Sequence, residues 1–148
     1  MSFRDKYVRL VETMDLFHGI HPEVLMRIMA MGLTEAVTKG TTIFQKGDAG
    51  NKMYVILEGK VKVIDDGKVI AVLGKGEMFG EMALLSPEKR SATVVAEESS
   101  SFFVLTAPAF HQLFTKPVAI RLLLNIVGTL SERLRKTNNE LLAQRHKS

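Results

Sequence analysis

The sequence predicts a mainly β (α+β) domain: an antiparallel β-roll or jelly roll with N-terminal helices and a long C-terminal helix. Short β-prone runs separated by glycine-containing turns fill the middle of the chain at roughly even spacing, which is typical of a sandwich or barrel. Helical spacing of apolar residues is confined to the two ends. A chain of 148 residues, 46% hydrophobic and 24% charged, suits one domain with a single sizeable core.

Residues 4–32 are expected to form two helices. Apolar residues recur at spacings of three and four on both sides of His18-Gly19, and Pro22 suits the first turn of the second helix. His18 and His21 have the spacing of a metal-binding pair, but the sequence nearby offers no evident acidic or thiol third ligand. We therefore interpret them as part of the connection between the helices, and no metal site is expected.

From Thr41 the periodicity changes to that of short strands. Asp65-Asp66-Gly67 predicts a hairpin turn because Asp-Gly readily takes positive φ, and the two carboxylates should face water rather than form a catalytic pair. The predicted strands of the β-roll are residues 42–44, 53–58, 61–64, 69–73, 91–97 and 102–106.

Two helices are expected after the last strand. Residues 107–114 form a short one, and Pro117 starts a long one that covers about residues 118–143. The long helix carries an apolar seam at alternating steps of four and three, which is typical of helices that pair. The seam consists of Leu123, Val127, Leu130, Leu134 and Leu141, with Thr137 in the missing step. A polar residue at that step sets the register between paired helices, contacts a ligand, or does both.

The single predicted domain, residues 1–148, divides into N-terminal helices (1–35), the β-roll (36–106) and C-terminal helices (107–148). Its formal net charge is +4, and residues 131–148 hold five Lys or Arg against two Glu. We interpret this excess as a solvated helix end, which basic residues stabilise, rather than as a surface for nucleic acid. The absence of cysteine from the sequence excludes disulfides, a thiol nucleophile and a zinc-thiolate site.

The sequence also predicts a cytoplasmic protein with no membrane partner. Its charged start, residues 1–7, is not followed by the apolar segment of a secretory signal. The longest apolar stretch, residues 118–127, is too short to span a bilayer. The sequence offers no nucleophile with a base beside it, so an enzyme is not expected.

The most informative stretch is residues 79–96, F-G-E-M-A-L-L-S-P-E-K-R-S-A-T-V-V-A. Gly80 enters a short helical turn and lets backbone N–H groups converge on an anion without a Cβ in the way. Arg90 can bind the same anion in bidentate fashion, whereas the carboxylate of Glu81 requires a hydroxyl donor. These residue types suit a ligand with both a phosphate and a free hydroxyl. The alternative is a structural ion pair between Glu81 and Arg90 under a surface loop.

This stretch resembles the phosphate-binding cassette of cyclic-nucleotide-binding domains. Gly47-Asp48, the run Y-V-I-L-E-G at residues 54–59 and the glycines before the cassette look like the same family, so the resemblance covers about residues 10–142. It implies that Glu81 binds a ribose 2′-hydroxyl and that Arg90 binds the cyclic phosphate. The further phosphate contacts that it implies are the Ser91 hydroxyl and the backbone amides of Gly80, Glu81, Met82 and Ala83. One departure is Lys89, where many members of the family have Pro before the Arg.

The resemblance also implies a ligand and a mode of action. The ligand is a 3′,5′-cyclic nucleotide, with cyclic AMP favoured over cyclic GMP because members that prefer cyclic GMP often have Thr where this chain has Ser91. In the catabolite-activator branch, the long final helix mediates dimerisation and brings polar side chains to the purine. Aligned with those positions, Arg133, Thr137 and Asn138 are the candidate base contacts. We therefore expect a homodimeric regulatory module in which ligand docking is coupled to the position of the C-terminal helix and read by an unknown effector.

Two other interpretations stay open. One is a ligand-independent dimerisation or interaction module with a degenerate cassette. The other, a cupin-type metalloenzyme, is disfavoured because the four histidines are expected outside the strands. Transcription regulators of the family continue into a helix-turn-helix that this sequence lacks, so no nucleic-acid partner is expected, and the sequence is either a free-standing binding protein or part of a longer one.

Overall fold

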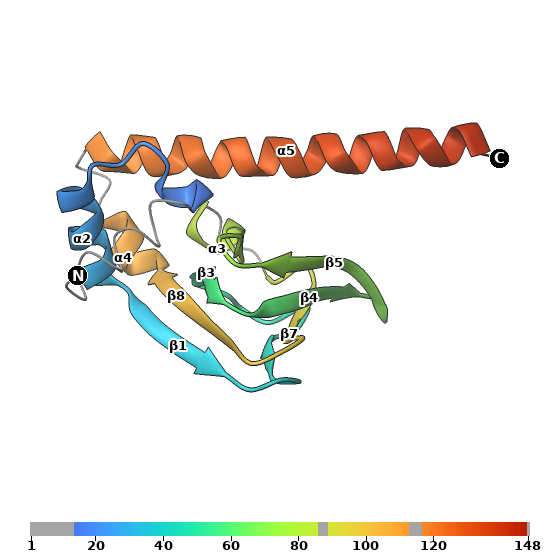
Figure 1. Ribbon diagram of the computed structural model, residues 1–148, viewed down its shortest axis with the longest axis horizontal. Coiled ribbons are helices and arrows are strands. Elements are labelled where there is room, and N and C mark those ends of the chain that lie inside the picture. Colours follow the sequence, from blue (N-terminus) through green and yellow to red (C-terminus); the bar gives the residue numbers. More distant parts are fainter. Residues whose placement is uncertain (1–13, 86–88, 113–116, 148) are drawn as a thin grey trace.

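Two four-stranded antiparallel sheets form a β-roll, and a long helix lies along one side of it (Figure 1). The computed structural model describes residues 14–85, 89–112 and 117–147. The architecture is the predicted one, a β-roll with short helices before it and a long helix after it. In chain order the elements are η1 (Asp15–Phe17), α2 (Pro22–Met31), β1 (Leu33–Val37), β2 (Thr42–Phe44), β3 (Lys52–Glu58), β4 (Lys60–Asp65), β5 (Lys68–Gly74), β6 (Met78–Phe79), α3 (Met82–Leu85), β7 (Thr93–Ala96), β8 (Ser100–Thr106), α4 (Ala107–His111) and α5 (Pro117–Lys147).

Strand β3 connects the two halves of the core. The strand order is β1-β8-β3-β6 in one sheet and β2-β7-β4-β5 in the other. Because side chains alternate along a strand, Met53 and Val55 pack in a cluster with the helices, whereas Tyr54 and Ile56 pack in a cluster between the sheets. β3 is therefore buried on both faces, and the second cluster supports the interior of the roll.

The turn between β4 and β5 is the hairpin predicted from Asp65-Asp66-Gly67. Asp66 and Gly67 have positive φ values of 50° and 76°, and Asp65 lies opposite Lys68 at the end of the ladder. Lys46 Nζ lies 2.7 Å from a carboxylate oxygen of Asp65 and 3.3 Å from one of Asp66. Both carboxylates lie at the surface, as the sequence predicts.

Two strands, β1 and β6, were not among the predicted ones. β1 begins at Leu33, directly after α2, although residues 33–35 were assigned to the N-terminal helices. The whole of β1 pairs with β8, and Gly32 allows the close approach because a Cβ there would collide with the ring of Phe103. β6 has two residues and is too short to carry a recognisable period.

The region before β1 agrees with the prediction where the structure describes it. Helix α2 begins with Pro22, and His21 precedes it as a cap whose imidazole Nδ1 accepts a hydrogen bond from the Glu23 N–H at 3.2 Å. The first predicted helix, up to residue 13, lies outside the described residues. So do residues 86–88 of the cassette and the end of the predicted 107–114 helix.

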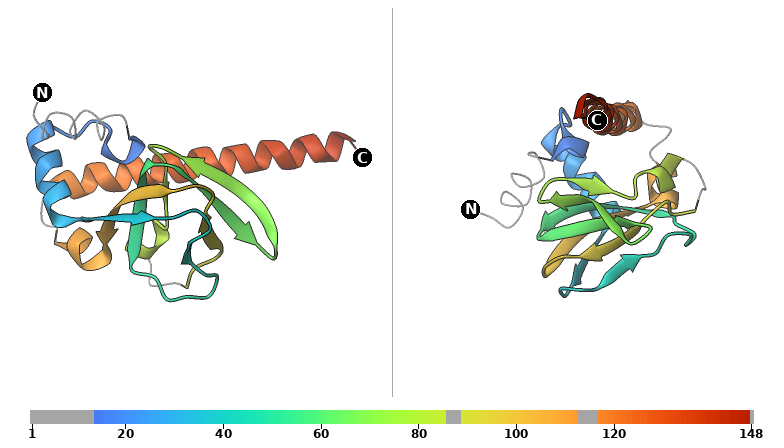
Figure 2. Two further views of the ribbon diagram at one scale, coloured as in Figure 1. Left: turned by 60° about the horizontal axis from the view of Figure 1, so that its bottom comes forward. Right: turned by 90° about the vertical axis from the view of Figure 1, so that its right-hand side faces the viewer.

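Helix α5 is continuous over 31 residues and longer than predicted. Its first half packs on the core through Leu122 and Ile126, while its C-terminal end projects beyond the roll (Figures 1 and 2). Asn125 Nδ2 donates to the carbonyl oxygens of Leu16 (2.6 Å) and His18 (3.0 Å), which fastens the η1 turn to this helix. In the part of the chain that the structure describes, no helix is both long enough and apolar enough to cross a membrane.

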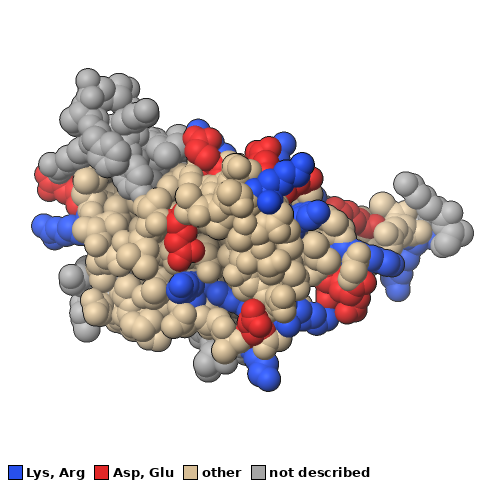
Figure 3. All heavy atoms as spheres, turned by 90° about the horizontal axis from the view of Figure 1, so that it is seen from below, with Lys and Arg blue, Asp and Glu red and all other residues tan. Residues whose placement is uncertain are grey.

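The predicted apolar seam of α5 is divided between the core and the surface. Leu123 and Leu130 pack against the core, whereas Val127, Leu134 and Leu141 are exposed. Elsewhere the surface carries charges of both signs. On the face opposite α5, basic and acidic side chains are interspersed around a largely uncharged centre (Figure 3).

Candidate functional site

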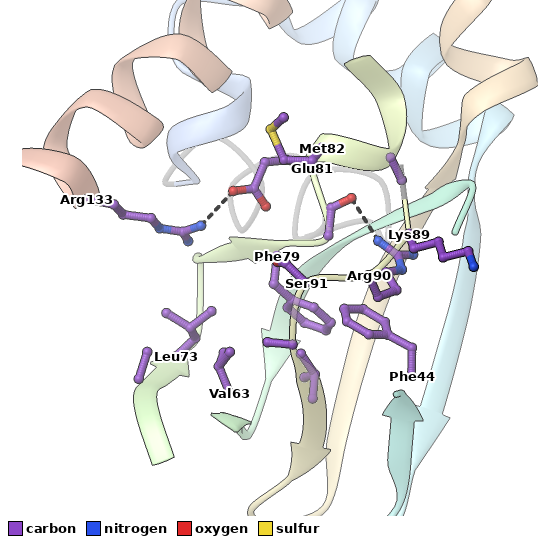
Figure 4. A pocket seen from close by; sticks show the side chains of 15 residues that line it. Phe44, Val63, Leu73, Phe79, Glu81, Met82, Lys89, Arg90, Ser91 and Arg133 are labelled. Atoms are coloured by element: carbon purple, nitrogen blue, oxygen red, sulfur yellow. Dashed lines mark hydrogen bonds and ion pairs between the residues drawn. The ribbon is translucent and has the colours of Figure 1, made fainter. Parts of the chain in front are cut away.

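A cavity of about 300 Å³ lies between the cassette and the strands of the roll, close to the middle of α5 (Figure 4). Apolar side chains from the strands form one part of its wall, among them Val63, Leu73 and Phe79. Residues of the cassette form the other part, with Glu81, Lys89 and Arg90 as its charged residues, and Arg133 of α5 completes the lining. The cavity therefore has an apolar wall facing a charged one.

Glu81 is a buried carboxylate on the α5 side of the cavity. Gly80, which precedes it, has a φ of 74°, a conformation that glycine adopts without strain. Glu81 is 6% exposed, and Arg133 Nη1 lies 2.9 Å from its Oε1. Arg133 Nη2 also donates to the carbonyl oxygen of Met78. Because a buried carboxylate requires a partner, this ion pair fastens the middle of α5 to the cassette.

Arg90 lies at the other end of the charged wall (Figure 4). Its Nη1 donates to the carbonyl oxygen of Gly80 at 3.2 Å, and its Nη2 donates to that of Lys52 at 2.6 Å. Its Nε is the buried side-chain nitrogen that lacks a hydrogen-bond partner among the described residues. The guanidinium group is thus held by two neutral carbonyls and keeps unused donors for an anion.

The electrostatics of the two groups differ. Burial lowers the pKa of the Arg90 guanidinium, and Tyr54, Glu81 and Asp48 oppose that shift. Glu81 forms its ion pair with Arg133, and no ion pair between described residues includes Arg90. The alternative in which Glu81 and Arg90 neutralise each other is therefore wrong, and a cation and a carboxylate face the same cavity separately.

A sequence model described as "Cyclic nucleotide-binding domain" matches residues 34–116, which is more than half of the chain. The chain belongs to this family. Its β-roll, its cassette and the cavity between them are the parts of a cyclic nucleotide-binding domain that the match covers.

Three similar proteins indicate the range of this family. The chain is 33% identical over 132 residues to the cyclic AMP receptor protein of Thermus thermophilus, covering 85% of this chain and 60% of that protein. It is 31% identical over 115 residues to human cGMP-dependent protein kinase 2, covering 73% of this chain and 15% of the kinase. The crystal structure of a cyclic nucleotide-binding domain from Methylobacillus flagellatus superposes with a TM-score of 0.84 at 27% identity, covering 95% and 85% of the two chains. The chain thus spans less than two thirds of the two curated relatives.

The structure brings most of the predicted binding residues of this cyclic nucleotide-binding domain together. Seven of them line the one cavity: Gly80, Glu81, Met82, Ala83, Arg90, Ser91 and Arg133. Thr137 and Asn138 lie farther along α5, are exposed and are outside the cavity lining, and Thr137 Oγ1 donates to the carbonyl oxygen of Arg133 at 3.0 Å. The Ala83 N–H already donates to the Gly80 carbonyl oxygen at 3.2 Å, so this amide is engaged within the turn.

Two contributors to the site were not predicted from the sequence. The ring of Phe44 lies against Arg90, with 4.0 Å between its centroid and the guanidinium carbon. Gly50 leaves space for the same side chain, since a Cβ at this position would collide with Arg90 Nε. Both residues lie at least 40 positions from Arg90 in the sequence, and no local pattern links them to it.

The described residues contain no group of three His, Cys, Asp or Glu side chains that could hold a metal ion.

Proposed function

We propose that this domain binds a 3′,5′-cyclic nucleotide in the cavity, with the cyclic phosphate at Arg90 and the ribose 2′-hydroxyl at Glu81, and that cyclic AMP is preferred. The observation that carries the proposal is that Arg90 and Glu81 face one cavity without being paired to each other. A ligand that carries a phosphate and a hydroxyl on neighbouring atoms of one ring satisfies both groups at once.

The phosphate end is explained by the unused donors of Arg90. Its buried Nε–H lacks a partner among the described residues, and an unpaired buried donor is costly. A phosphate oxygen supplies that partner, and each charge-assisted bond contributes about 1.5–3 kcal/mol. Ser91 and the backbone amides at Gly80, Glu81 and Met82 lie on the same wall and add donors to the phosphate.

The ribose end is explained by the burial of Glu81. One carboxylate oxygen accepts from Arg133, and a carboxylate has about four lone-pair sites, so it can accept a hydroxyl as well. A 2′-deoxy ligand leaves that acceptor unsatisfied, which is the strongest way in which a buried polar site rejects an analogue. Glu81 therefore selects a ribonucleotide.

Coupling to α5 follows from the same carboxylate. Arg133 bridges Glu81 and the Met78 carbonyl, so a ligand that binds Glu81 contacts the same carboxylate that holds the middle of the helix. If the ligand also contacts α5 directly, it favours the docked helix and shifts the population toward it. We propose Arg133, Thr137 and Asn138 as the base contacts, the last two through movement of the helix or from a second copy of the chain.

A second copy is proposed to pair along α5. The exposed side of the helix carries Val127, Leu134 and Leu141 at heptad spacing, and two such helices bury these side chains against each other. Leu134→Glu should therefore convert a dimer to a monomer in analytical ultracentrifugation. An unchanged sedimentation coefficient would exclude this helix as the interface. The effector that reads the helix, and the cytoplasmic location expected from the sequence, stay predictions.

The choice between cyclic AMP and cyclic GMP rests on Ser91 and on the base contacts. The similar proteins include one named for cyclic AMP and one named for cyclic GMP, so the family alone is compatible with either ligand. Thr137→Ala should change the ratio of the two dissociation constants if Thr137 contacts the base. An unchanged ratio in calorimetry removes Thr137 from the site.

Thermal unfolding with cyclic AMP, cyclic GMP, 2′-deoxy cyclic AMP and adenosine tests the proposal. A ligand at 100 times its dissociation constant stabilises the folded state by about 2.7 kcal/mol, which corresponds to roughly 5–10 °C for a chain of this size. Arg90→Ala should weaken cyclic AMP binding by at least about tenfold, whereas Arg135→Ala, at an exposed position of α5, should leave it unchanged. If no cyclic nucleotide raises the midpoint at millimolar concentration and the chain still dimerises, it is a ligand-independent interaction module.

A further inference from the structure

The orientation of Arg90 is determined without a carboxylate. Its two hydrogen-bond acceptors are the backbone carbonyls of Gly80 and Lys52, and no ion pair between residues that the structure describes includes it. A carboxylate would orient the guanidinium equally well, but it would also neutralise the charge and occupy the edge that an anion needs. The structure therefore orients this cation by contacts that do not compete with an anionic ligand.

Phe44 supplies a further contact that does not use a carboxylate. The guanidinium carbon of Arg90 lies 4.0 Å from the centroid of the ring, well within the distance at which a cation is attracted to an aromatic face. Figure 4 shows the ring beneath the guanidinium group, at the end of the cavity away from Arg133. The remaining space around the group is limited, because a Cβ at Gly50 would collide with Arg90 Nε and one at Gly80 would approach Nη1 to 2.8 Å.

The ring of Phe44 is itself held in place. It lies 6.1 Å from the ring of Tyr54 and 6.0 Å from the ring of Phe79. Those two rings stack on each other at 4.8 Å with an angle of 4° between their planes, and both meet Phe102 edge to face. Because aromatic pairs at these distances attract each other, the two neighbouring rings favour the orientation in which Phe44 lies against Arg90.

Some N–H groups of the Arg90 guanidinium are not used by the two carbonyls. A guanidinium has five N–H groups, and the two carbonyls engage one on each terminal nitrogen. The Nε–H and the second N–H of each Nη remain, and a guanidinium group can bind an anion through two parallel N–H···O bonds. A π face below the plane attracts the charge and uses none of these N–H groups.

We propose that Phe44 is a positioning residue for the phosphate, holding the Arg90 guanidinium by a cation–π contact that takes the place of a carboxylate partner. This inference rests on the proposed function, because the anion it serves is the cyclic phosphate. It predicts that the aromatic character of residue 44, and not only its volume, determines affinity for the phosphate part of the ligand.

The test compares Phe44→Leu and Phe44→Tyr with the wild type. Calorimetry measures the dissociation constant for cyclic AMP. NMR titration up to millimolar concentration measures that for adenosine, which lacks the phosphate. Phe44→Leu should weaken cyclic AMP binding by about 3- to 30-fold and leave adenosine binding unchanged, while Phe44→Tyr should stay close to the wild type. Equal losses for both ligands would show a merely structural role and overturn the proposal.

Two further measurements keep the proposal falsifiable if Phe44→Leu folds poorly. Fluorinated phenylalanines at position 44 keep the shape of the ring and weaken its negative face, so affinity for cyclic AMP should fall stepwise with the number of fluorines. In an Arg90→Ala background, Phe44→Leu should cause no additional loss, because the contact is already gone. Unchanged affinity in the fluorinated series, or a full additional loss in the double variant, would overturn the role of Phe44. Absence of cyclic nucleotide binding to the wild type would instead overturn the proposed function itself.

Discussion

The ion pair between Glu81 and Arg133 is expected to be a main attachment of α5 to the cassette, and Arg133→Met tests this directly. Methionine keeps an unbranched apolar stem but removes the guanidinium group, and with it the charge and both donors. The change leaves a carboxylate that is only 6% exposed without its cationic partner and also leaves the Met78 carbonyl oxygen without this donor.

The expected cost follows from these contacts. Breaking a fully buried pair costs about 3–5 kcal/mol, but the Arg133 side chain is 33% exposed, so water can solvate part of the change. We expect the free energy of unfolding to fall by about 2–3 kcal/mol, which lowers the melting midpoint by roughly 4–12 °C. Urea denaturation of the ligand-free protein measures the loss.

Arg135→Met is the matched control on the same helix. Arg135 pairs with Glu132 at the same distance of 2.9 Å, but the two side chains are 68% and 71% exposed, and such a pair contributes little. Its removal should change stability by less than about 0.5 kcal/mol. In a Glu81→Gln background, Arg133→Met should cost at least about 1 kcal/mol less than in the wild type. Equal effects of the two arginine variants, or strict additivity in the double variant, would refute the reasoning.

Three further predictions follow from other contacts. Asn125→Ala removes the amide that holds two carbonyls of the η1 turn and should lower the free energy of unfolding by about 1–3 kcal/mol; a loss below 0.5 kcal/mol in urea titration contradicts this role. Gly50→Ala places a methyl group where Arg90 Nε lies and should reduce cyclic AMP affinity at least about tenfold, whereas Gly74→Ala, where a Cβ meets open space, should not; calorimetry compares them. Burial, with a smaller contribution from the carboxylate of Glu35, raises the pKa of Tyr54 above its usual value near 10. The stability that the protonated form of Tyr54 contributes is therefore present below about pH 10 and is lost as the pH rises through the folded-state pKa. Tyr54→Phe should flatten the decline of stability above pH 10, and an unchanged slope in alkaline urea titrations would contradict this assignment.

Local patterns predicted a large part of the fold because they depend on neighbouring residues. The Asp66-Gly67 pair predicted the β4–β5 hairpin since positive φ is a property of these residue types. The cassette predicted that Glu81 and Arg90 share a site, and the structure brings them to one cavity. Strand β1 was missed, because its residues become a strand through pairing with β8, almost 70 positions later.

The chain by itself therefore determined which groups could bind a phosphate and a hydroxyl: an arginine and a carboxylate at fixed spacing after a glycine. Only the tertiary structure decided what those groups contact. Glu81 meets Arg133 from 52 positions away, and Arg90 meets Phe44 and the Lys52 carbonyl across other strands. The physical reason is that spacing along a chain specifies geometry within a turn or helix, whereas the partners of a buried charge depend on which distant elements pack together around it.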